Sequence, residues 1–263
     1  MCRMIGHETK PVLQSVANAL EILKLYSDST PELGISEISH RMKIGKSTAF
    51  RLVSTLAWAG FLEQNPENSK YYLGLELLQL SRLVINRMSI IKDAHPYLTT
   101  LSSKIGETVH LVVLSGFHAM FVDKVKGSSF ANMGSTVGMM VPAHATASGK
   151  MLLCYKSDDE IEEYLRRTEL PQYTMHSLTT PEQVRKVLAD ARANGYAEDL
   201  EEMEEGLRCI AAPVFGFDGT AVGSVSISGA ASRMERNRGL YLEEIHRTAL
   251  EISQKLGYSH GVN

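Results

Sequence analysis

The strongest constraint on the fold is a run of three short helical patterns followed by a hairpin pattern. The five patterned stretches, in chain order, are 12–26, 35–42, 46–59, 61–64 and 70–73. The second and third helical stretches are separated only by Lys43-Ile44-Gly45, in which Gly45 is available as a cap or positive-φ residue. A turn-rich loop, 65–69, joins the two strand-like runs. This order predicts a winged helix-turn-helix, in which the helix after the tight turn enters the major groove of DNA.

The distribution of charge favours the same reading. Residues 1–92 carry 11 Lys and Arg against 8 Asp and Glu, whereas residues 93–263 carry 16 against 22. A basic end on an acidic body is typical of a small nucleic-acid-binding region. The free amides at a helix N-terminus favour phosphate, and an arginine one turn further along can reach a guanine edge. The candidate DNA contacts are Lys46, Ser47, Thr48, Arg51 and, in the hairpin, Lys70. A three-helix bundle with a solvated basic helix remains the alternative.

The rest of the chain predicts a linker helix and a second domain. A helical pattern over 75–92 is long enough to join two domains and to form a dimer surface, with Leu77, Leu80 and Val84 on one stripe. Beyond it, helical and strand-like stretches alternate, and Gly216-Phe217-Asp218-Gly219 is a hairpin signal. We expect an α+β domain with an antiparallel sheet flanked by helices. The predicted division is 1–75, 76–92 and 93–263.

Composition excludes several classes of protein. No apolar run approaches the roughly 20 residues that span a bilayer, and the first residues lack the apolar core of a signal peptide. The three cysteines are far apart and odd in number, which argues against a disulfide framework or a zinc ribbon. The nine histidines show no ligand-type spacing, so we expect no metal and no cofactor. These features predict a cytoplasmic protein without membrane contact.

Three segments of the second domain have residues suited to chemistry. A helix begins within 143–150, where free amides near Ala147 and Ser148 could bind an anion, although an ordinary helix cap gives the same pattern. The segment matches neither a nucleotide-binding P-loop nor a hydrolase elbow. The acidic run 198–205 is either a solvated loop, a cation site or a set of acceptors for ligand hydroxyls. Ser224, Ser226 and Ser228 share one face of a strand, which either lines a polar pocket or meets solvent.

Five segments, in family order, resemble the IclR-type bacterial transcriptional regulators. They are 34–42, 45–52, 143–150, 205–214 and 224–229, and the resemblance runs from about Val12 to Tyr258. Gly45 departs slightly from the family, in which Pro or Ser is frequent at this position. The stretch 204–210 is most similar to the sugar-acid and pectin-catabolism repressors of the family.

The resemblance implies a winged-helix domain, a linker helix and a GAF-like effector domain, assembled as a homodimer or a dimer of dimers. It implies that a small organic acid or sugar acid binds the second domain and changes binding to a pseudo-palindromic operator in double-stranded DNA. Backbone amides at Ala147 and Ser148 would hold the carboxylate. The other implied effector contacts are Asp199, Cys209, Ser226 and Ser228, with an apolar wall at Phe130, Met133 and Leu207.

Two other functions compete with a ligand-responsive repressor. A hydrolase built on Ser148, His144 and Asp199 is opposed by the missing nucleophile elbow and the missing dedicated histidine. A metal- or redox-sensing regulator that uses Cys209 is opposed by the missing ligand spacing, and a cysteine on an apolar strand is usually a small buried hydrophobe. The sequence therefore predicts a DNA-binding regulator without enzymatic activity.

Overall fold

The chain forms two compact units, Met1–Arg87 and Met88–Asn263. The structure, a computed structural model, describes residues 12–27, 29–87, 89–129 and 134–259. Among the helices in these ranges, none is both long enough and apolar enough to cross a membrane.

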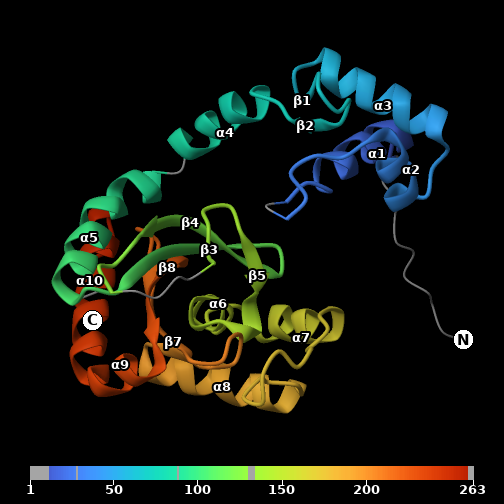
Figure 1. Ribbon diagram of the computed structural model, residues 1–263. Coiled ribbons are helices and arrows are strands. Elements are labelled where there is room, and N and C mark those ends of the chain that lie inside the picture. Colours follow the sequence, from blue (N-terminus) through green and yellow to red (C-terminus); the bar gives the residue numbers. More distant parts are fainter. Residues whose placement is uncertain (1–11, 28, 88, 130–133, 260–263) are drawn as a thin grey trace, which may run out of the picture. The chain divides into compact units, whose positions relative to one another are not determined.

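The first unit is the predicted winged helix-turn-helix (Figure 1). Its elements are α1 Gln14–Leu23, α2 Ile35–Met42, α3 Lys46–Trp58, β1 Leu62–Gln64, β2 Tyr71–Leu73 and α4 Glu76–Arg87. A small core holds the three helices and the hairpin together, because each element contributes at least one fully buried side chain, such as Ile22, Ile38, Val53 and Leu62. This burial explains why the apolar spacing alone predicted the order of the elements.

In the tight turn between α2 and α3, Gly45 takes the first of its two expected roles, that of a cap, and the left-handed residue is Lys43. Gly45 is the N-cap of α3 with φ −62°, whereas Lys43 has φ 53° and ends α2. The Lys43 N–H donates to the His40 carbonyl at 3.2 Å, and the Ser39 hydroxyl donates to the Ile44 carbonyl at 2.7 Å. A left-handed conformation costs a residue with a side chain on the order of 1 kcal/mol. These bonds offset that cost.

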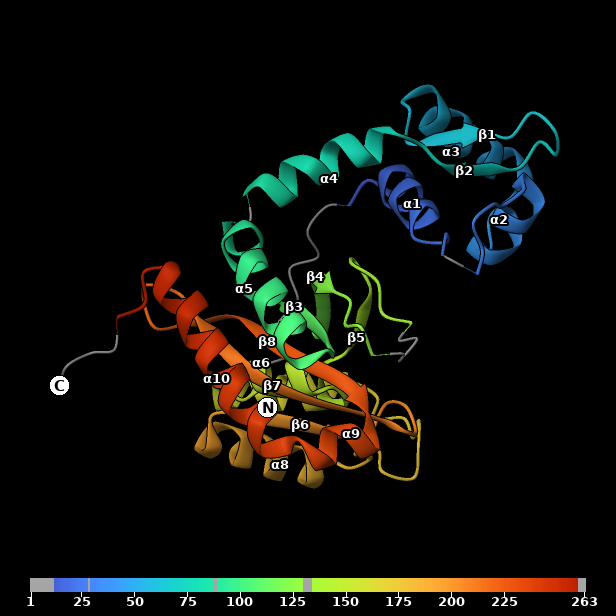
Figure 2. The same cartoon turned by 60° about the vertical axis from the view of Figure 1, so that its left-hand side comes forward.

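The β1–β2 hairpin is tied to the segment before and within α2 (Figure 2). Glu32 accepts hydrogen bonds from the side-chain amides of Asn65 and Asn68 at 3.0 and 2.7 Å. Glu37 accepts from the Gly34 N–H at 2.7 Å and lies 3.3 Å from the Lys70 ammonium. Polar contacts from Glu32 and Glu37 therefore hold the loop of the β1–β2 hairpin in place.

The helical segment after the hairpin divides into two helices. The helix expected over 75–92 corresponds to α4 and to the first turn of α5, Ser89–Ile105. Ile90 and Ile91 pack against the core of the second unit, so the start of α5 belongs to that unit. Leu78 and Leu83 of α4 are 67% and 58% exposed. The side chain of Val84 lies outside the described part of the chain.

The second unit contains a six-stranded antiparallel sheet in the order β5-β4-β3-β8-β7-β6. The strands are β3 Thr108–Ser115, β4 His118–Val125, β5 Met140–Pro142, β6 Ala197–Leu200, β7 Leu207–Phe215 and β8 Ala221–Ala230. Residues 216–219 form the predicted turn between β7 and β8, with Gly219 at φ 76°. The expected α+β domain with an antiparallel sheet is confirmed.

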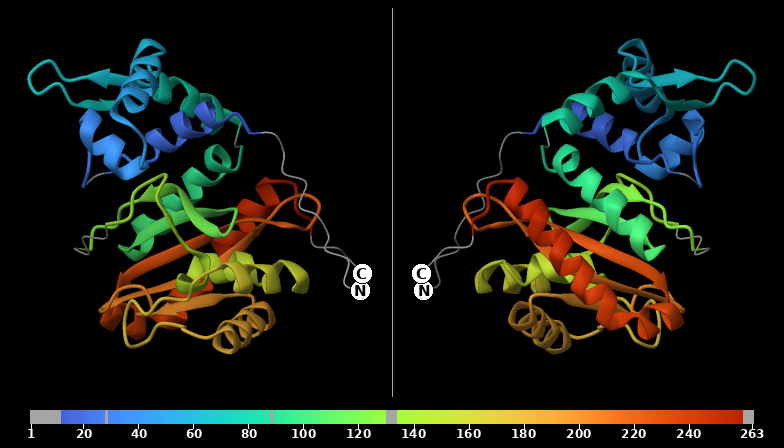
Figure 3. Two further views of the ribbon diagram at one scale, coloured as in Figure 1. Left: turned by 90° about the vertical axis from the view of Figure 1, so that its right-hand side faces the viewer. Right: turned by 90° about the vertical axis from the view of Figure 1, so that its left-hand side faces the viewer.

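Helices cover both faces of this sheet (Figure 3). The helices that follow α5 are α6 Ala147–Leu153, α7 Asp158–Arg167, α8 Pro181–Asn194, α9 Ala231–Arg236 and α10 Arg238–Lys255, and a 3₁₀ turn, Ala143–Ala145, precedes α6. α5 and α10 pack on one face, with Leu98 and Ile245 fully buried. α6, α7 and α8 pack on the other face around Met151 and Tyr164. The two faces therefore belong to separate apolar cores.

Strand β6 and helix α9 were not expected from the sequence. The acidic run 198–205, for which a solvated loop is one of the three interpretations, begins within β6, in which Asp199 is buried. By contrast, the ends of α8 carry residues that commonly mark helix ends: the N-cap Thr180, Pro181 in the first turn and Gly195 at φ 73° after the last residue. Local capping signals were thus easier to recognise than a short edge strand rich in acids.

Candidate DNA interface and ligand cavity

The N-terminal turn of α3 is exposed and basic. Ala49, Val53 and Leu56 face the core, which leaves Lys46 and Arg51 on the exposed side. Ser47 and Thr48 are exposed as well, so all four candidates on this helix are accessible to a partner. No side chain caps α3, and its first amides have no acceptor within the helix. The exposed amides and cations together favour phosphate oxygens.

The fifth DNA candidate, Lys70, is less free than the others. It is half-buried and its ammonium lies 3.3 Å from Glu37, which screens its charge. The sequence analysis also missed Phe50, which is 55% exposed beside Arg51. An apolar side chain on this surface is suited to contact with a thymine methyl group. Phe50 lies off the apolar stripe of α3, and this position could have identified it from the sequence as an exposed aromatic residue.

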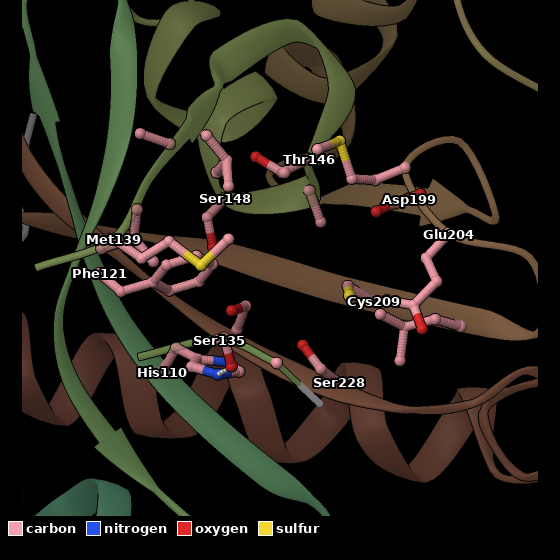
Figure 4. Close-up of a pocket in the computed structure, with 18 residues that line it drawn as sticks. His110, Phe121, Ser135, Met139, Thr146, Ser148, Asp199, Glu204, Cys209 and Ser228 are labelled. Atoms are coloured by element: carbon pink, nitrogen blue, oxygen red, sulfur yellow. Dashed lines mark hydrogen bonds between the residues drawn. The ribbon is translucent and has the colours of Figure 1, made fainter. Parts of the chain in front are cut away.

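A cavity of about 270 Å³ lies in the second unit, between α6 and the sheet (Figure 4). Seven of the nine residues assigned to an effector by resemblance line it: Ala147, Ser148, Asp199, Leu207, Cys209, Ser226 and Ser228. Phe130 and Met133 lie outside the described residues. The sequence analysis missed several further lining residues, among them His110, Phe121, Ser135, Met139, Thr146 and Glu204.

The register of the strands explains why residues far apart in sequence meet here. Asp199 of β6 is paired with Cys209 of β7, which is paired with Ser228 of β8. Ser226, two residues before Ser228, is paired with His110 of β3. Paired residues on neighbouring strands point to the same face of a sheet. The serine row therefore faces the cavity and not solvent.

The N-terminus of α6 forms the opposite wall. Thr146 is the N-cap and its hydroxyl accepts from the Gly149 N–H at 3.2 Å, which leaves the amides of Ala147 and Ser148 without an acceptor in the helix. A Cβ atom at Gly149 would lie 2.3 Å from the Ala143 carbonyl oxygen. Glycine at this position thus allows the preceding turn to pack closely against α6. This packing directs the N-terminus of the helix towards the cavity.

Three charged groups are buried beside this helix end. The Lys150 side chain is fully buried and forms an ion pair with Glu202. The Glu202 N–H donates to Asp199 Oδ1 at 2.8 Å. Burial raises the pKa of the Asp199 carboxyl to about 7, and the Glu202 charge acts in the same direction while Lys150 opposes it. Two carboxyl groups share one cation, so Asp199 is the member suited to carry a proton.

Two further groups that line the cavity, His110 and Cys209, are held in uncharged forms. Burial, followed by the Lys124 charge, lowers the pKa of His110 to about 3. Burial and the neighbouring Asp199 raise the pKa of the Cys209 thiol, so the reactive thiolate is disfavoured. Within the described residues, no three His, Cys, Asp or Glu side chains are grouped as metal ligands would be. The imidazole and the thiol of this cavity therefore offer a ligand neutral hydrogen-bonding groups.

The hydrolase arrangement is absent from the described residues. His144 is outside the cavity lining, and its Nδ1 is hydrogen-bonded to the Tyr164 hydroxyl at 2.7 Å. The buried Ser148 hydroxyl has no hydrogen-bond partner among the described residues. A serine nucleophile needs a histidine within hydrogen-bond reach.

Comparisons with known proteins cover both units. Residues 15–66 match the family described as the IclR helix-turn-helix domain, and residues 82–254 match the one described as bacterial transcriptional regulator IclR C-terminal. The HTH-type transcriptional regulator XynR of Escherichia coli strain K12 is 36% identical over 249 residues, which cover 94% of this chain and 99% of XynR.

Solved structures agree with these matches. The crystal structure of the Thermotoga maritima IclR is 34% identical, with a TM-score of 0.73, over 93% of this chain and 99% of that one. An IclR homologue from Microbacterium hydrocarbonoxydans, crystallised with 4-hydroxybenzoate, is 24% identical with a TM-score of 0.82 over 92% of this chain and 98% of that one, which shows a shared fold. The winged unit and the sheet domain thus match one family in the same order, and the chain belongs to the IclR family of bacterial transcriptional regulators, which makes it a DNA-binding regulator and not an enzyme.

Proposed function

We propose that this regulator represses a catabolic operon and that a small organic acid or sugar acid, bound in the cavity of the second unit, controls its binding to DNA. The supporting observation is that residues of four separate sequence segments line one cavity. Residues 1–75 would contact DNA, 76–92 would link the domains and 93–263 would bind the ligand. The protein would act in the cytoplasm, where the operator is.

The ligand would enter with its carboxylate towards α6. The amides of Ala147 and Ser148 supply donors and the positive end of the helix dipole, so one anionic group is favoured there. A protonated Asp199 would donate a hydrogen bond instead of repelling the anion. Ser226 and Ser228 would bind hydroxyl groups of the ligand from the sheet.

The DNA-bound form would contain two chains or two such pairs. One winged helix reads too little sequence for a unique genomic site, so we expect a pseudo-palindromic operator of double-stranded DNA. An apolar groove of about 550 Å³ between α1 and α3 includes Val16 and Leu20, which are 52% and 54% exposed. Leu80 of α4 is 41% exposed, and a second copy of the chain would cover such surfaces.

A thermal-shift screen of organic acids followed by operator binding tests the proposal. A ligand that binds the native state raises the melting temperature, and an effector also changes the affinity for operator DNA measured by fluorescence anisotropy. Ser226→Val, which removes one cavity hydroxyl, should weaken both responses. Thr248→Val removes a buried hydroxyl from α10, on the other face of the sheet, and should leave both unchanged.

Two results would contradict the proposal. One is a screen in which acids that shift the melting temperature have no effect on operator binding. The other is a light-scattering measurement that shows only monomers at micromolar concentration while operator binding is intact.

A further inference from the structure

His110 is a buried polar side chain with an unused hydrogen-bonding atom. It lies on β3, is 2% exposed and lines the cavity. Its Nε2 atom is 2.9 Å from the Ser135 hydroxyl, whereas its Nδ1 atom has no partner among the described residues. The Phe121 ring lies against it at a centroid distance of 4.9 Å. A buried polar atom without a partner is costly, so its presence beside a cavity needs an explanation.

The imidazole of His110 is neutral over the physiological pH range. Burial is the main cause of its low pKa of about 3, and the Lys124 charge adds to it. A neutral imidazole has one nitrogen that donates and one that accepts. One nitrogen is engaged with Ser135, and the other, which is buried, lacks within the described residues the uncharged hydroxyl or carbonyl that would satisfy it. The neutral ring offers no cation to a second carboxylate.

The position of His110 defines which part of a ligand it meets. It is paired with Ser226 in the sheet, which forms the wall of the cavity that faces α6. In Figure 4, His110 and Ser135 lie on the side of the cavity away from Thr146, the cap of α6. Val112, Phe121 and Met139 line the cavity on the β3–β5 side with apolar atoms. A ligand whose carboxylate binds at α6 would thus contact these apolar side chains between its carboxylate and the part that meets His110.

We propose that His110 selects for an uncharged hydroxyl group on the part of the ligand remote from its carboxylate, so that the effector is a hydroxy-monocarboxylic acid rather than a dicarboxylic acid. This inference rests on the proposed function, since it assumes that the carboxylate lies at α6. Ser135 is a positioning residue in this scheme, because its hydroxyl orients the ring through Nε2.

The test compares matched acids by titration calorimetry on the full-length protein. The probes are 5-hydroxypentanoate, pentanoate and glutarate, and 4-hydroxybenzoate, benzoate and terephthalate. In at least one set, the hydroxy acid should bind about tenfold more tightly than the unsubstituted acid, and the diacid should bind more weakly than either. In His110→Leu this advantage should fall to within about twofold, while binding of the unsubstituted acid is kept.

Two further variants test whether the preference for the hydroxy acid depends on His110 itself. His118→Leu applies the same substitution to an exposed histidine at the start of β4 and should keep the tenfold advantage. Ser135 lies outside the sheet, and Ser135→Ala should reduce the advantage of the hydroxy acid without abolishing it. This variant keeps the test valid if His110→Leu does not fold.

The outcomes separate this inference from the proposed function. If acids bind with no preference for the hydroxyl group, or if the preference survives in His110→Leu, the role of His110 is wrong and the acid-binding cavity stands. Preferred binding of a diacid also overturns the inference. If none of the six acids binds, the carboxylate site itself is wrong, and the inference falls with it.

Discussion

Two helix N-termini in this molecule carry similar residues in opposite surroundings. α3 begins with Lys46-Ser47-Thr48 after a glycine cap, and α6 begins with Ala147-Ser148-Gly149-Lys150 after a threonine cap. Lys46 and Ser47 are exposed, whereas every residue of α6 is buried. Both helix ends offer free amides and a nearby lysine. The difference in burial decides what each can bind.

The exposed helix end is suited to a polymer whose charge is approached from outside, and we propose its lysine, Lys46, as a contact. The buried helix end is suited to a small anion that enters a cavity, and its lysine is neutralised by Glu202. The proposed roles of Lys46 and Lys150 thus differ: Lys46 would contact DNA, whereas Lys150 balances the charge of buried carboxyl groups. Substitutions at matched positions of the two helices separate these uses.

The largest contrast should come from the two lysines. Lys150→Met leaves the Glu202 and Asp199 carboxyl groups buried without a cation and should lower the free energy of unfolding by about 3–5 kcal/mol. Lys46→Met should change it by less than about 0.5 kcal/mol, since the side chain is exposed. Urea unfolding of both variants measures the difference.

The double variant Lys150→Met, Glu202→Gln should recover much of the lost stability, because it removes the uncompensated charge. If Lys150→Met unfolds like the wild type, the pair is not a buried ion pair and the comparison fails.

The next contrast concerns the two serines. Ser148→Leu fills the cavity beside the free amides and should weaken binding of an identified effector at least about 100-fold, while operator binding without effector is unchanged. Ser47→Leu should do the reverse, because it places an apolar side chain where phosphate is expected. Calorimetry and fluorescence anisotropy on each variant measure the two affinities. The prediction fails if Ser148→Leu keeps the wild-type response to effector.

The fold was predictable where the pattern was local. The pattern over 35–42 predicted the bounds of α2, and the ends of α8 carry capping residues of the same local kind. The left-handed residue of the turn before α3 could not be predicted in this way. It is Lys43, which adopts that conformation through hydrogen bonds although a glycine is nearby.

The cavity was predictable only in part. The serine row could be derived from the alternation of β8, but its orientation depends on pairing with β3 and β7. Asp199 was assigned only through the family resemblance, because nothing in the local acidic pattern shows that β6 pairs with β7. His110 carried no signal, since its burial and its contact with Ser135 result from a loop that returns to the sheet from β4. Long-range pairing therefore sets the parts of the site that the sequence analysis missed.

A smaller effect is expected on the reading face of α3. Arg51→Ala should weaken operator binding by about 1–3 kcal/mol if the guanidinium contacts a base, with little change on unrelated DNA. If Arg51 contacts only phosphate, binding to all sequences should fall together, with a shallower dependence on salt. Anisotropy titrations at several salt concentrations distinguish the two cases. Unchanged affinity in both Arg51→Ala and Lys46→Ala would refute the assignment of this face.

The smallest effect concerns the pH dependence of the buried helix end. The Asp199 carboxyl has a pKa near 7 in the folded protein and an ordinary value of 3.8 when exposed, so between these values the folded state holds a proton that the unfolded chain has lost. The contribution of this group to stability is therefore present below about pH 4 and is lost as pH rises towards 7.

Between pH 5 and pH 6, the wild type should lose about 1 kcal/mol of stability relative to Asp199→Asn, which has no proton to lose. Carboxyl groups remote from Asp199 titrate equally in both proteins and cancel in the difference. Urea unfolding of both at the two pH values measures it, with Ser47→Ala as a control in which the difference from wild type should not change with pH. A difference between wild type and Asp199→Asn that is constant over this range would mean that Asp199 is ionised in the folded protein, and the two helix ends would then differ in burial but not in the charge that they tolerate.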